Sequence, residues 1–93
     1  MRKIERTGAF KRDFRRELRG RYGSALDQAL SVIVTALAED QPLPERNRDH
    51  ALIGRWIEFR DCHIRPDLVL IYRKPDQERL QLVRLGSHSE LGL

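Results

Sequence analysis

The stretch that decides the fold is Leu68-Val-Leu-Ile-Tyr-Arg73, a nearly continuous apolar run in a chain rich in charge. Apolar residues at successive positions over this length predict a central strand, buried on both faces of a sheet. Turn-forming segments lie on either side of it, Arg65-Pro66-Asp67 before and Lys74 to Glu78 after. We therefore expect the strand to pair with segments that precede and follow these turns.

Three further segments predict strands. Residues 57–64 (IEFRDCHI) alternate loosely between apolar and polar side chains, and residues 79–85 (RLQLVRL) direct Leu80 and Leu82 toward a core. Residues 1–6 (MRKIER) surround one central apolar side chain with charge, which is typical of an edge strand protected against unwanted pairing. The second half of the chain thus predicts an antiparallel meander of three to four strands.

A first helix is expected over residues 8–19, directly after the N-terminal strand. Thr7 is a suitable cap, and Phe10, Phe14 and Leu18 recur every fourth residue as one narrow apolar stripe. The rest of its surface is strongly basic, through Lys11, Arg12, Arg15, Arg16 and Arg19.

A second helix is expected from Ser24 to about residue 39, because Ser24-Ala-Leu-Asp27 resembles a capping box and proline follows at Pro42. The short joint between the helices predicts an antiparallel helical hairpin. Neither apolar stripe is wide enough for a helical bundle, so both helices should lie on the sheet. Residues 1–93 are therefore predicted to form one two-layer α+β domain: an N-terminal strand, the helical hairpin and the meander.

Composition narrows the class of protein. No stretch approaches the ~18 apolar residues of a membrane span, and the basic start leads into no signal-like segment, so we expect a cytoplasmic protein. A single cysteine, Cys62, excludes an internal disulfide and a cysteine metal cluster, and is expected to pack inside. The histidine spacings match no compact metal-ligand pattern, so no metal site is expected.

The charge is concentrated at the N-terminal end. Residues 1–21 carry nine Lys/Arg and three acids, and fifteen of the eighteen cations in the chain are arginine. Arginine binds phosphate through paired hydrogen bonds, so the basic face of the first helix predicts a nucleic-acid surface. The alternative is a solvated arginine-rich face without a partner.

The candidate catalytic residues lie in the second half of the chain. His63 and Asp67 flank the turn at residues 65–67, so we expect them to be neighbours. The end of the last strand should lie near the start of the preceding one, which adds Arg84 and His88 to the same rim. His88, after Gly86 and Ser87, is expected on a short mobile tail.

Such a cluster suits cleavage of RNA without a metal. Histidine can take the proton of a 2′-hydroxyl or protonate the leaving 5′-oxygen, and arginine can stabilise the charge at phosphorus. Each residue also has a structural alternative: a hydrogen-bonded histidine, Asp67 as a turn cap, or Arg84 in an ion pair. Trp56 is either a core residue or a platform on which a base stacks.

Four motifs carry a family resemblance: H-x-L-x-G-x-W at residues 50–56, R-D-x-H-I at 60–64, P-D-x-x-L-I-Y at 66–72, and R-x-G-x-H at 84–88. In this order they resemble the YafQ group of the RelE/ParE toxin superfamily, over essentially the whole chain. The resemblance implies a RelE-like fold and the toxin of a type II toxin–antitoxin system. Such toxins are ribosome-dependent endoribonucleases that cut mRNA without a metal or organic cofactor.

The resemblance also implies roles and partners. The positions that match the catalytic ones are His50, His63, Asp67, Arg84 and His88. We expect His88 to be the general acid and Arg84 to stabilise charge, with Asp67 or His63 as the base and His50 holding the substrate or orienting a partner. The basic helix face would bind ribosomal RNA.

The implied partners are the ribosome with its mRNA and a cognate antitoxin, which would carry a ribbon-helix-helix domain and bring the toxin to operator DNA. Leu68 and Leu91 stand where some members carry aromatic residues, which predicts weaker or altered mRNA positioning. Two other functions remain open: a non-enzymatic superfamily toxin that poisons DNA gyrase, and a plain nucleic-acid-binding module.

Overall fold

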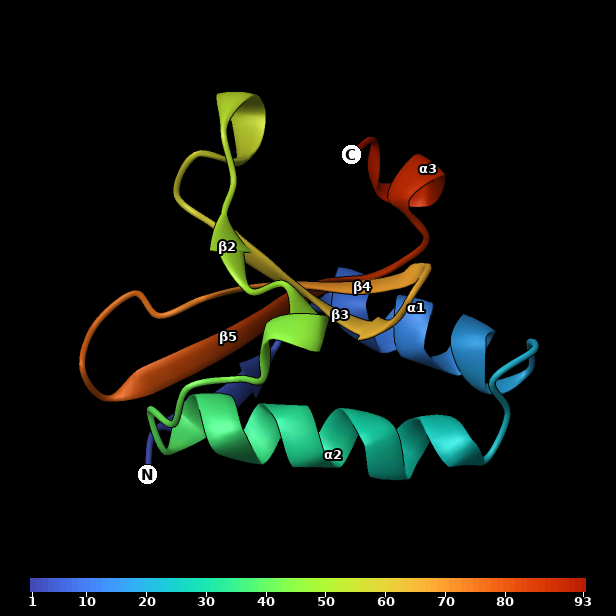
Figure 1. The fold of residues 1–93 in the computed structure, drawn as a ribbon, viewed down its shortest axis with the longest axis horizontal. Coiled ribbons are helices and arrows are strands. Elements are labelled where there is room, and N and C mark those ends of the chain that lie inside the picture. Colours follow the sequence, from blue (N-terminus) through green and yellow to red (C-terminus); the bar gives the residue numbers. More distant parts are fainter.

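The apolar run at Leu68–Arg73 forms strand β4, the middle strand of a five-stranded sheet, in a computed structural model that describes all 93 residues. Its side chains from Leu68 to Ile71 are fully buried, as expected for a strand covered on both faces. The strand order is β1-β5-β4-β3-β2 (Figure 1), with β1 at Lys3–Arg6, β2 at His50–Ala51, β3 at Arg60–Arg65 and β5 at Arg79–Gly86.

The last four strands form the predicted antiparallel meander, and β1 is an edge strand that pairs with β5 in parallel. Two boundaries differ from the sequence prediction. β3 begins at Arg60 rather than at residue 57, because Gly54–Trp56 forms a 3₁₀ turn in which Gly54 adopts a φ of 66°. Strand β2 was not predicted, since a two-residue strand carries no periodic pattern.

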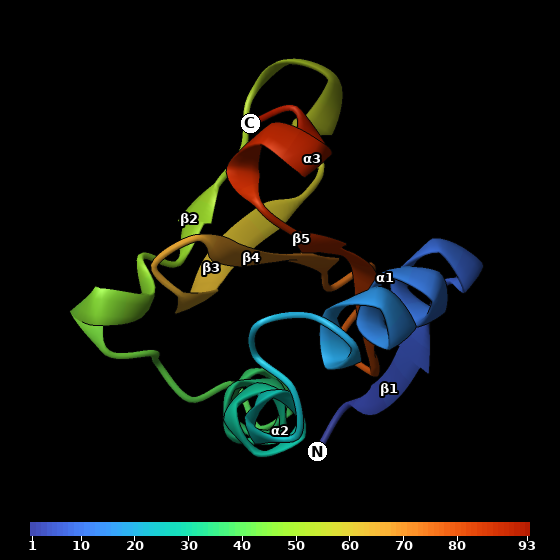
Figure 2. The ribbon, with the colours of Figure 1, turned by 90° about the vertical axis from the view of Figure 1, so that its right-hand side faces the viewer.

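Both predicted helices cover one face of the sheet: α1 at Gly8–Leu18 and α2 at Ala25–Ala38 (Figure 2). In that view α2 is seen end-on and α1 runs obliquely, so the two helices cross the sheet in different directions. Thr7 caps α1 by accepting a hydrogen bond from the Phe10 amide at 3.0 Å. The predicted capping box at Ser24 is wrong, because Ser24 has helical backbone angles and its side chain makes no cap bond.

The main core lies between these helices and the sheet, and confirms the two-layer α+β fold. Helix residues such as Phe10, Leu26 and Leu37 meet strand residues such as Leu70 and Leu82 there. Cys62 is fully buried in the same core, and burial raises the pKa of its thiol, so it behaves as an apolar residue. None of the helices has the length and apolar character needed to cross a membrane.

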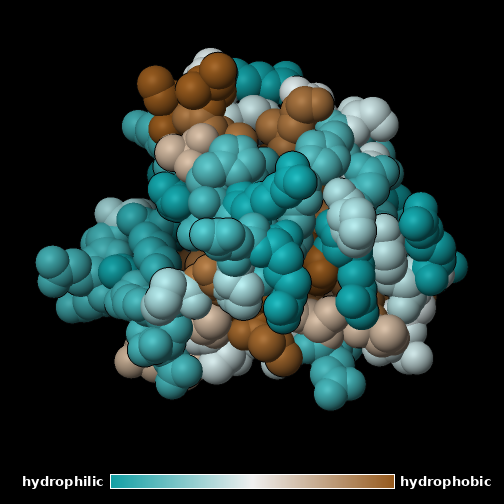
Figure 3. All heavy atoms as spheres, viewed as in Figure 1, coloured by the Kyte–Doolittle hydropathy of each residue, from teal (hydrophilic) through white to brown (hydrophobic).

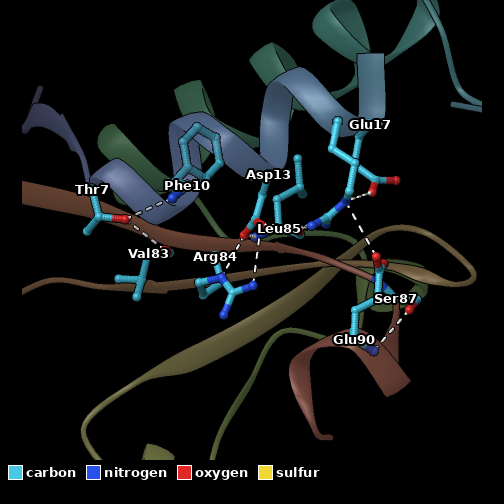
Figure 4. A network of polar contacts seen from close by, with 10 residues as sticks. Thr7, Phe10, Asp13, Glu17, Val83, Arg84, Leu85, Ser87 and Glu90 are labelled. Carbon is cyan, nitrogen blue, oxygen red and sulfur yellow. Dashed lines mark hydrogen bonds and ion pairs between the residues drawn. The ribbon is translucent and has the colours of Figure 1, made fainter. Parts of the chain in front are cut away.

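Helix α1 also closes an open edge of the sheet. Strand β1 pairs only with residues 79–82 of β5, so the backbone of the second half of β5 lacks a strand partner on that side. Side chains of α1 and its cap supply the missing bonds: Thr7 Oγ1 donates to the Val83 carbonyl at 2.8 Å, and Asp13 accepts from the Leu85 amide at 3.0 Å. Figure 4 shows these contacts along β5. They tie the basic helix firmly to the strand that leads to the C-terminus.

The opposite face of the sheet carries a second, smaller core. Val69 and Ile71 pack there against Leu91, which belongs to a short helix α3 at His88–Leu91. The expectation of a mobile tail is therefore wrong. Ser87 and Glu90 form a complete capping box at the start of α3, and Leu91 is only 1% exposed.

Candidate active site

The candidate catalytic side chains gather on the sheet face that points away from α1 and α2. Alternation along β3 directs Cys62 and Ile64 into the main core, which leaves Asp61 and His63 on the other face. The β2 register sets His50 directly opposite Asp61. In Figure 1 the segment after β2 and helix α3 rise from this face as two arms, and His88 begins the second arm.

His88 is held by Asp67 from the turn between β3 and β4. Asp67 Oδ1 accepts from His88 Nδ1 at 2.9 Å and from the His88 amide at 3.3 Å. The side-chain bond, followed by the backbone bond, lowers the pKa of Asp67, so its carboxylate stays ionised. With Nδ1 bonded to a carboxylate, we assign the Nδ1–H tautomer, and Nε2 is the ring nitrogen left to exchange protons.

His63 lies against His88 instead of bonding to Asp67. The two imidazole rings meet edge to face with 4.9 Å between centroids. Burial, and then the neighbouring His88, lower the pKa of His63, which keeps its imidazole neutral near pH 7. Direct ring contact leaves no room for a phosphate group between these two residues.

The imidazole of His50 lies beside the buried carboxylate of Asp61, its partner on the neighbouring strand. Its Nδ1 lies 2.6 Å from the Arg48 carbonyl and 3.2 Å from Asp61 Oδ1, so Nδ1 must carry the proton and Nε2 has a free lone pair. The Asp61 contact is close enough for an ion pair but lacks hydrogen-bond geometry, which leaves Asp61 Oδ1 without a hydrogen-bond partner. Burial raises the pKa of Asp61, and the charges of all three histidines act against that rise.

Two clefts meet at His88. One, of about 590 Å³, is lined by His63 together with Arg46, Arg48 and Arg65. The other, of about 500 Å³, lies between His50 and the C-terminus and has apolar walls from Leu52, Ile53, Trp56 and Leu93. A basic cleft suits a phosphate backbone, and an apolar cleft suits a nucleobase.

The arm that carries the apolar cleft ends in an exposed apolar tip. Ile53 is 86% exposed and Ile57 is 70% exposed, and Figure 3 shows hydrophobic atoms gathered at this corner above a largely polar surface. Trp56 packs edge to face against Phe59, and the Arg55 guanidinium lies 5.6 Å from the centre of its ring. Trp56 therefore contributes to packing, which is the first of the two roles that the sequence left open for it.

The predicted cations fall into two groups. Lys11, Arg12 and Arg15 are exposed on α1, and Arg19 is exposed at its C-cap. Arg16 instead turns toward β5 and α3, and Arg84 is bound to the buried carboxylate of Asp13 at 2.7 Å. Arg84 lines neither of the two clefts beside the histidines.

Leu68 and Leu91, the two departures from the family pattern, do not face either cleft. Leu68 is fully buried in the main core, and Leu91 is buried in the smaller core beneath α3. Their aliphatic side chains therefore contribute to packing.

Sequence reasoning did not assign functional roles to Asp61 or to the cleft arginines. Asp61 shares a strand face with His63, which is a signal in the sequence, but its contact with His50 depends on the β2–β3 register. Arg46 and Arg48 lie in the irregular segment before β2, where no periodicity indicates which way a side chain points.

Comparison with known proteins identifies the family. The sequence profile of a family described as "Bacterial toxin of type II toxin-antitoxin system, YafQ" matches residues 2–92. The chain belongs to the YafQ family. This confirms the resemblance drawn from the four motifs, and with it the assignment of the chain as a toxin of a type II toxin–antitoxin system.

Two relatives show how far the similarity extends. The mRNA interferase toxin YafQ of Escherichia coli strain B is 31% identical over 90 residues, which are 97% of this chain and 95% of that one. A protein of Haemophilus influenzae named as a YafQ toxin is 49% identical over 55 residues, 56% of this chain and 54% of that one. The aligned part thus spans about half of the second relative and nearly all of the first.

Solved structures agree with this assignment. A copper-bound mutant toxin from Helicobacter pylori is 41% identical, with a TM-score of 0.86 over 98% of this chain and 99% of that one. The toxin in an E. coli DinJ–YafQ complex is 32% identical, with a TM-score of 0.79 over 98% of each chain. The H. pylori toxin holds copper, whereas no three His, Cys, Asp or Glu side chains of this chain are grouped as a metal site.

Proposed function

We propose that this protein is a ribosome-dependent endoribonuclease that cleaves mRNA and so inhibits translation as the toxin of its toxin–antitoxin pair. The observation that carries the proposal is the arrangement around His88: an imidazole fixed by an ionised carboxylate, facing a second oriented imidazole, where a basic and an apolar cleft meet. The names of the E. coli relatives, mRNA interferase toxins, support the same activity.

The reaction we propose is attack by a 2′-hydroxyl on the adjacent phosphate. His50 Nε2 removes the 2′-hydroxyl proton, the 2′-oxygen bonds to phosphorus, and the bond from phosphorus to the 5′-oxygen breaks. His88, acting in its imidazolium form with Nδ1–H still bonded to Asp67, gives its Nε2 proton to the departing 5′-oxygen, which yields a 2′,3′-cyclic phosphate, a free 5′-hydroxyl and a neutral His88. No metal or organic cofactor takes part in this scheme.

His50 is our choice for the base because it faces His88 across the apolar cleft, whereas the rings of His63 and His88 are in direct contact. Asp67, the other candidate from the sequence, is already bound to His88 and serves to orient that ring. We propose that His63 packs beside His88 and keeps it facing the substrate.

The charge that develops on the phosphate needs a cation. We assign this task to arginines of the basic cleft, Arg48 and Arg65 first among them, because they line the same cleft as His63 and His88. Arg84 lines neither cleft and is bound to Asp13, so we propose that it supports α1 and β5 rather than the phosphate.

Ribosome dependence follows from the open form of the site and from the exposed cations of α1. The clefts lie at the surface of a small domain, so a partner has to hold the mRNA in place. Four exposed cations of α1 are suited to bind ribosomal RNA: Lys11, Arg12, Arg15 and Arg19.

The partner that would restrain the toxin is a cognate antitoxin. The DinJ–YafQ complex supports an antitoxin partner for this family. We propose that the antitoxin of this protein carries a ribbon-helix-helix domain and brings the toxin to operator DNA, and that a basic toxin binds an acidic antitoxin segment. The protein would act in the cytoplasm, where ribosomes and mRNA meet.

The test is single-turnover cleavage of mRNA on ribosomes by His88→Gln. Loss of a positioned acid should lower the cleavage rate about 10²–10⁴-fold, while ribosome binding persists. An mRNA with sulfur in place of the 5′-oxygen at the cut should restore most of the rate, because a thiolate leaves without a proton. Normal cleavage by His88→Gln, equal cleavage of free RNA, or no rescue by the sulfur substrate would each refute the proposal.

A further inference from the structure

We propose that Arg16 is a positioning residue for His88, which it holds in place through Glu90 by tying helix α3 to helix α1. The inference rests on the proposed function, because it gives His88 a catalytic task. It also changes the role expected for Arg16, which the sequence grouped with the cations that bind ribosomal RNA. Figure 4 shows the contacts that carry it.

The guanidinium of Arg16 has three hydrogen-bond partners in α1 and β5. Its Nη1 donates to Asp13 at 3.0 Å, its Nη2 donates to the Leu85 carbonyl at 2.9 Å, and its Nε donates to Glu17 at 3.0 Å. Asp13 is only 2% exposed and is itself held by Arg84 and by the Leu85 amide. The guanidinium is thus anchored to both α1 and β5, although the Arg16 side chain is 42% exposed.

The same guanidinium reaches Glu90 in α3, with Arg16 Nε 3.4 Å from Glu90 Oε2. The other carboxylate oxygen, Oε1, accepts from the Ser87 amide at 2.9 Å and completes the capping box. Glu90 therefore joins Arg16 to the first turn of α3, and His88 is the first residue of that turn. The Ser87 amide bond, with help from Arg16, lowers the pKa of Glu90, so the pair remains charged.

Gly86 allows this contact to form. A β-carbon at that position would lie 3.0 Å from Arg16 Nη2 and 3.2 Å from Glu90 Oε1. Both distances are shorter than ordinary van der Waals contact. A larger residue here would require the ends of the Arg16 and Glu90 side chains to move apart by a few tenths of an ångström.

A helix of four residues has almost no stability of its own, so its direction is set by contacts with the rest of the chain. Leu91 anchors α3 to the apolar face of the sheet, and Asp67 holds the His88 ring. Arg16 and Glu90 supply a third attachment, on the side of α1. Because a displacement of about 1 Å at a reacting group can cost ~100-fold in rate, a loosened α3 should slow the proton transfer.

Two variants of the protein and one control variant test the inference. Glu90→Gln keeps an oxygen for the capping bond but removes the ion pair with Arg16. Arg16→Lys keeps the positive charge that attracts RNA but cannot make the fork of bonds. Glu5→Gln is the matched control, since it removes an ion pair of the same 3.4 Å length, with Arg79, that involves neither Arg16 nor α3.

Two measurements are needed: the cleavage rate at saturating ribosomes, and hydrogen exchange of the α3 amides that bond within that segment, at Leu91, Gly92 and Leu93. Glu90→Gln and Arg16→Lys should each lower the saturating rate about tenfold and speed the exchange of these amides. The double variant should be no slower than the worse single variant, because both changes break one link. Glu5→Gln should change neither quantity.

Unchanged exchange in Glu90→Gln and Arg16→Lys would overturn the inference. Faster exchange with a normal saturating rate would also overturn the positioning role. So would an Arg16→Lys protein that differs only in the ribosome concentration needed for half saturation, because that result assigns Arg16 to docking. The exchange measurement needs no activity, so a failure of the proposed function, seen with His88→Gln, is distinguished from a failure of the Arg16–Glu90 link.

Discussion

Replacing Asp61 by asparagine should stabilise the protein and slow its reaction. Asp61 is 3% exposed, and its Oδ1 has no hydrogen-bond partner, although His50 Nδ1 lies 3.2 Å away. When the imidazoles are neutral, no opposite charge on a histidine and no hydrogen bond to Oδ1 offsets the cost of burying this carboxylate. The residue is thus unfavourable for folding, and its value must lie in what it does beside His50.

The size of the gain follows from that burial. A buried polar group without a partner costs about 1–3 kcal/mol, and more when it is charged. Asparagine removes the charge but keeps a polar amide, so we expect Asp61→Asn to raise the free energy of unfolding by about 1–2 kcal/mol at pH 8. Because burial raises the pKa of Asp61, the gain should vanish below the ordinary value of 3.8, where the carboxyl is protonated in both states, grow as the pH rises from 3.8 to the raised pKa, and stay constant above it.

The effect on the reaction should have the opposite sign. A carboxylate beside His50 stabilises the imidazolium that forms when His50 takes the 2′-hydroxyl proton. The Arg48 carbonyl still holds the ring in its tautomer, so the loss should be moderate: about 10–100-fold in the single-turnover cleavage rate.

Urea unfolding followed by circular dichroism from pH 4 to pH 8 measures the first effect, and cleavage at saturating ribosomes measures the second. Glu58→Gln is the control, since Glu58 is an exposed acid and its loss should change stability by less than about 0.5 kcal/mol. An Asp61→Asn protein that loses 1 kcal/mol or more at pH 8, or one that cleaves at the normal rate, would refute the reasoning.

Three other predictions concern the remaining polar contacts. Asp13→Asn should lower the free energy of unfolding at pH 7 by about 2–3 kcal/mol, because it removes a buried partner of two partly exposed arginines. Burial alone would raise the pKa of Asp13, but the bonds from Arg84 and Leu85 lower it overall, so in urea unfolding the loss should shrink as the pH falls below 3.8; a constant loss contradicts this. Gly86→Ala should crowd Arg16 and Glu90, lowering the saturating cleavage rate severalfold and speeding exchange in α3; an unaltered α3 argues against close contact. Lys11, Arg12, Arg15 and Arg19 replaced together by glutamine should flatten the salt dependence of ribosome binding, by roughly 0.7–0.9 per lost contact in the log–log slope. An unchanged slope would show that the protein docks through another surface.

Much of the fold could be predicted because its signals are local. The apolar run gave the bounds of β4 at Leu68–Arg73 correctly, and the four-residue apolar spacing located α1 to within one residue. Thr7 capped its helix as predicted, whereas Ser24 did not. A capping pattern describes what a residue is able to do, and the chain entering α2 from the turn before it decides the backbone angles at Ser24.

The candidate site was predictable in part. The sequence indicated that His63, Asp67 and His88 lie together, and the structure brings Asp67 and His63 each into contact with His88. It did not indicate that Asp67 bonds His88 rather than His63. Nor did it indicate that Asp61 contacts His50.

By itself, the sequence determined which segments become strands and helices, which faces are apolar, and which side chains are available for acid–base chemistry. These properties depend on neighbours within one or two turns of chain. Only the tertiary structure decided which of those side chains meet. The strand register shifts between His63 and Arg65 on β3 and between Ile71 and Tyr72 on β4, and a shift of one residue changes the sheet face on which the following side chains lie. The pairing of Asp67 with His88, and of Arg84 with Asp13, depends on contacts between segments 21 and 71 residues apart, which no local pattern encodes.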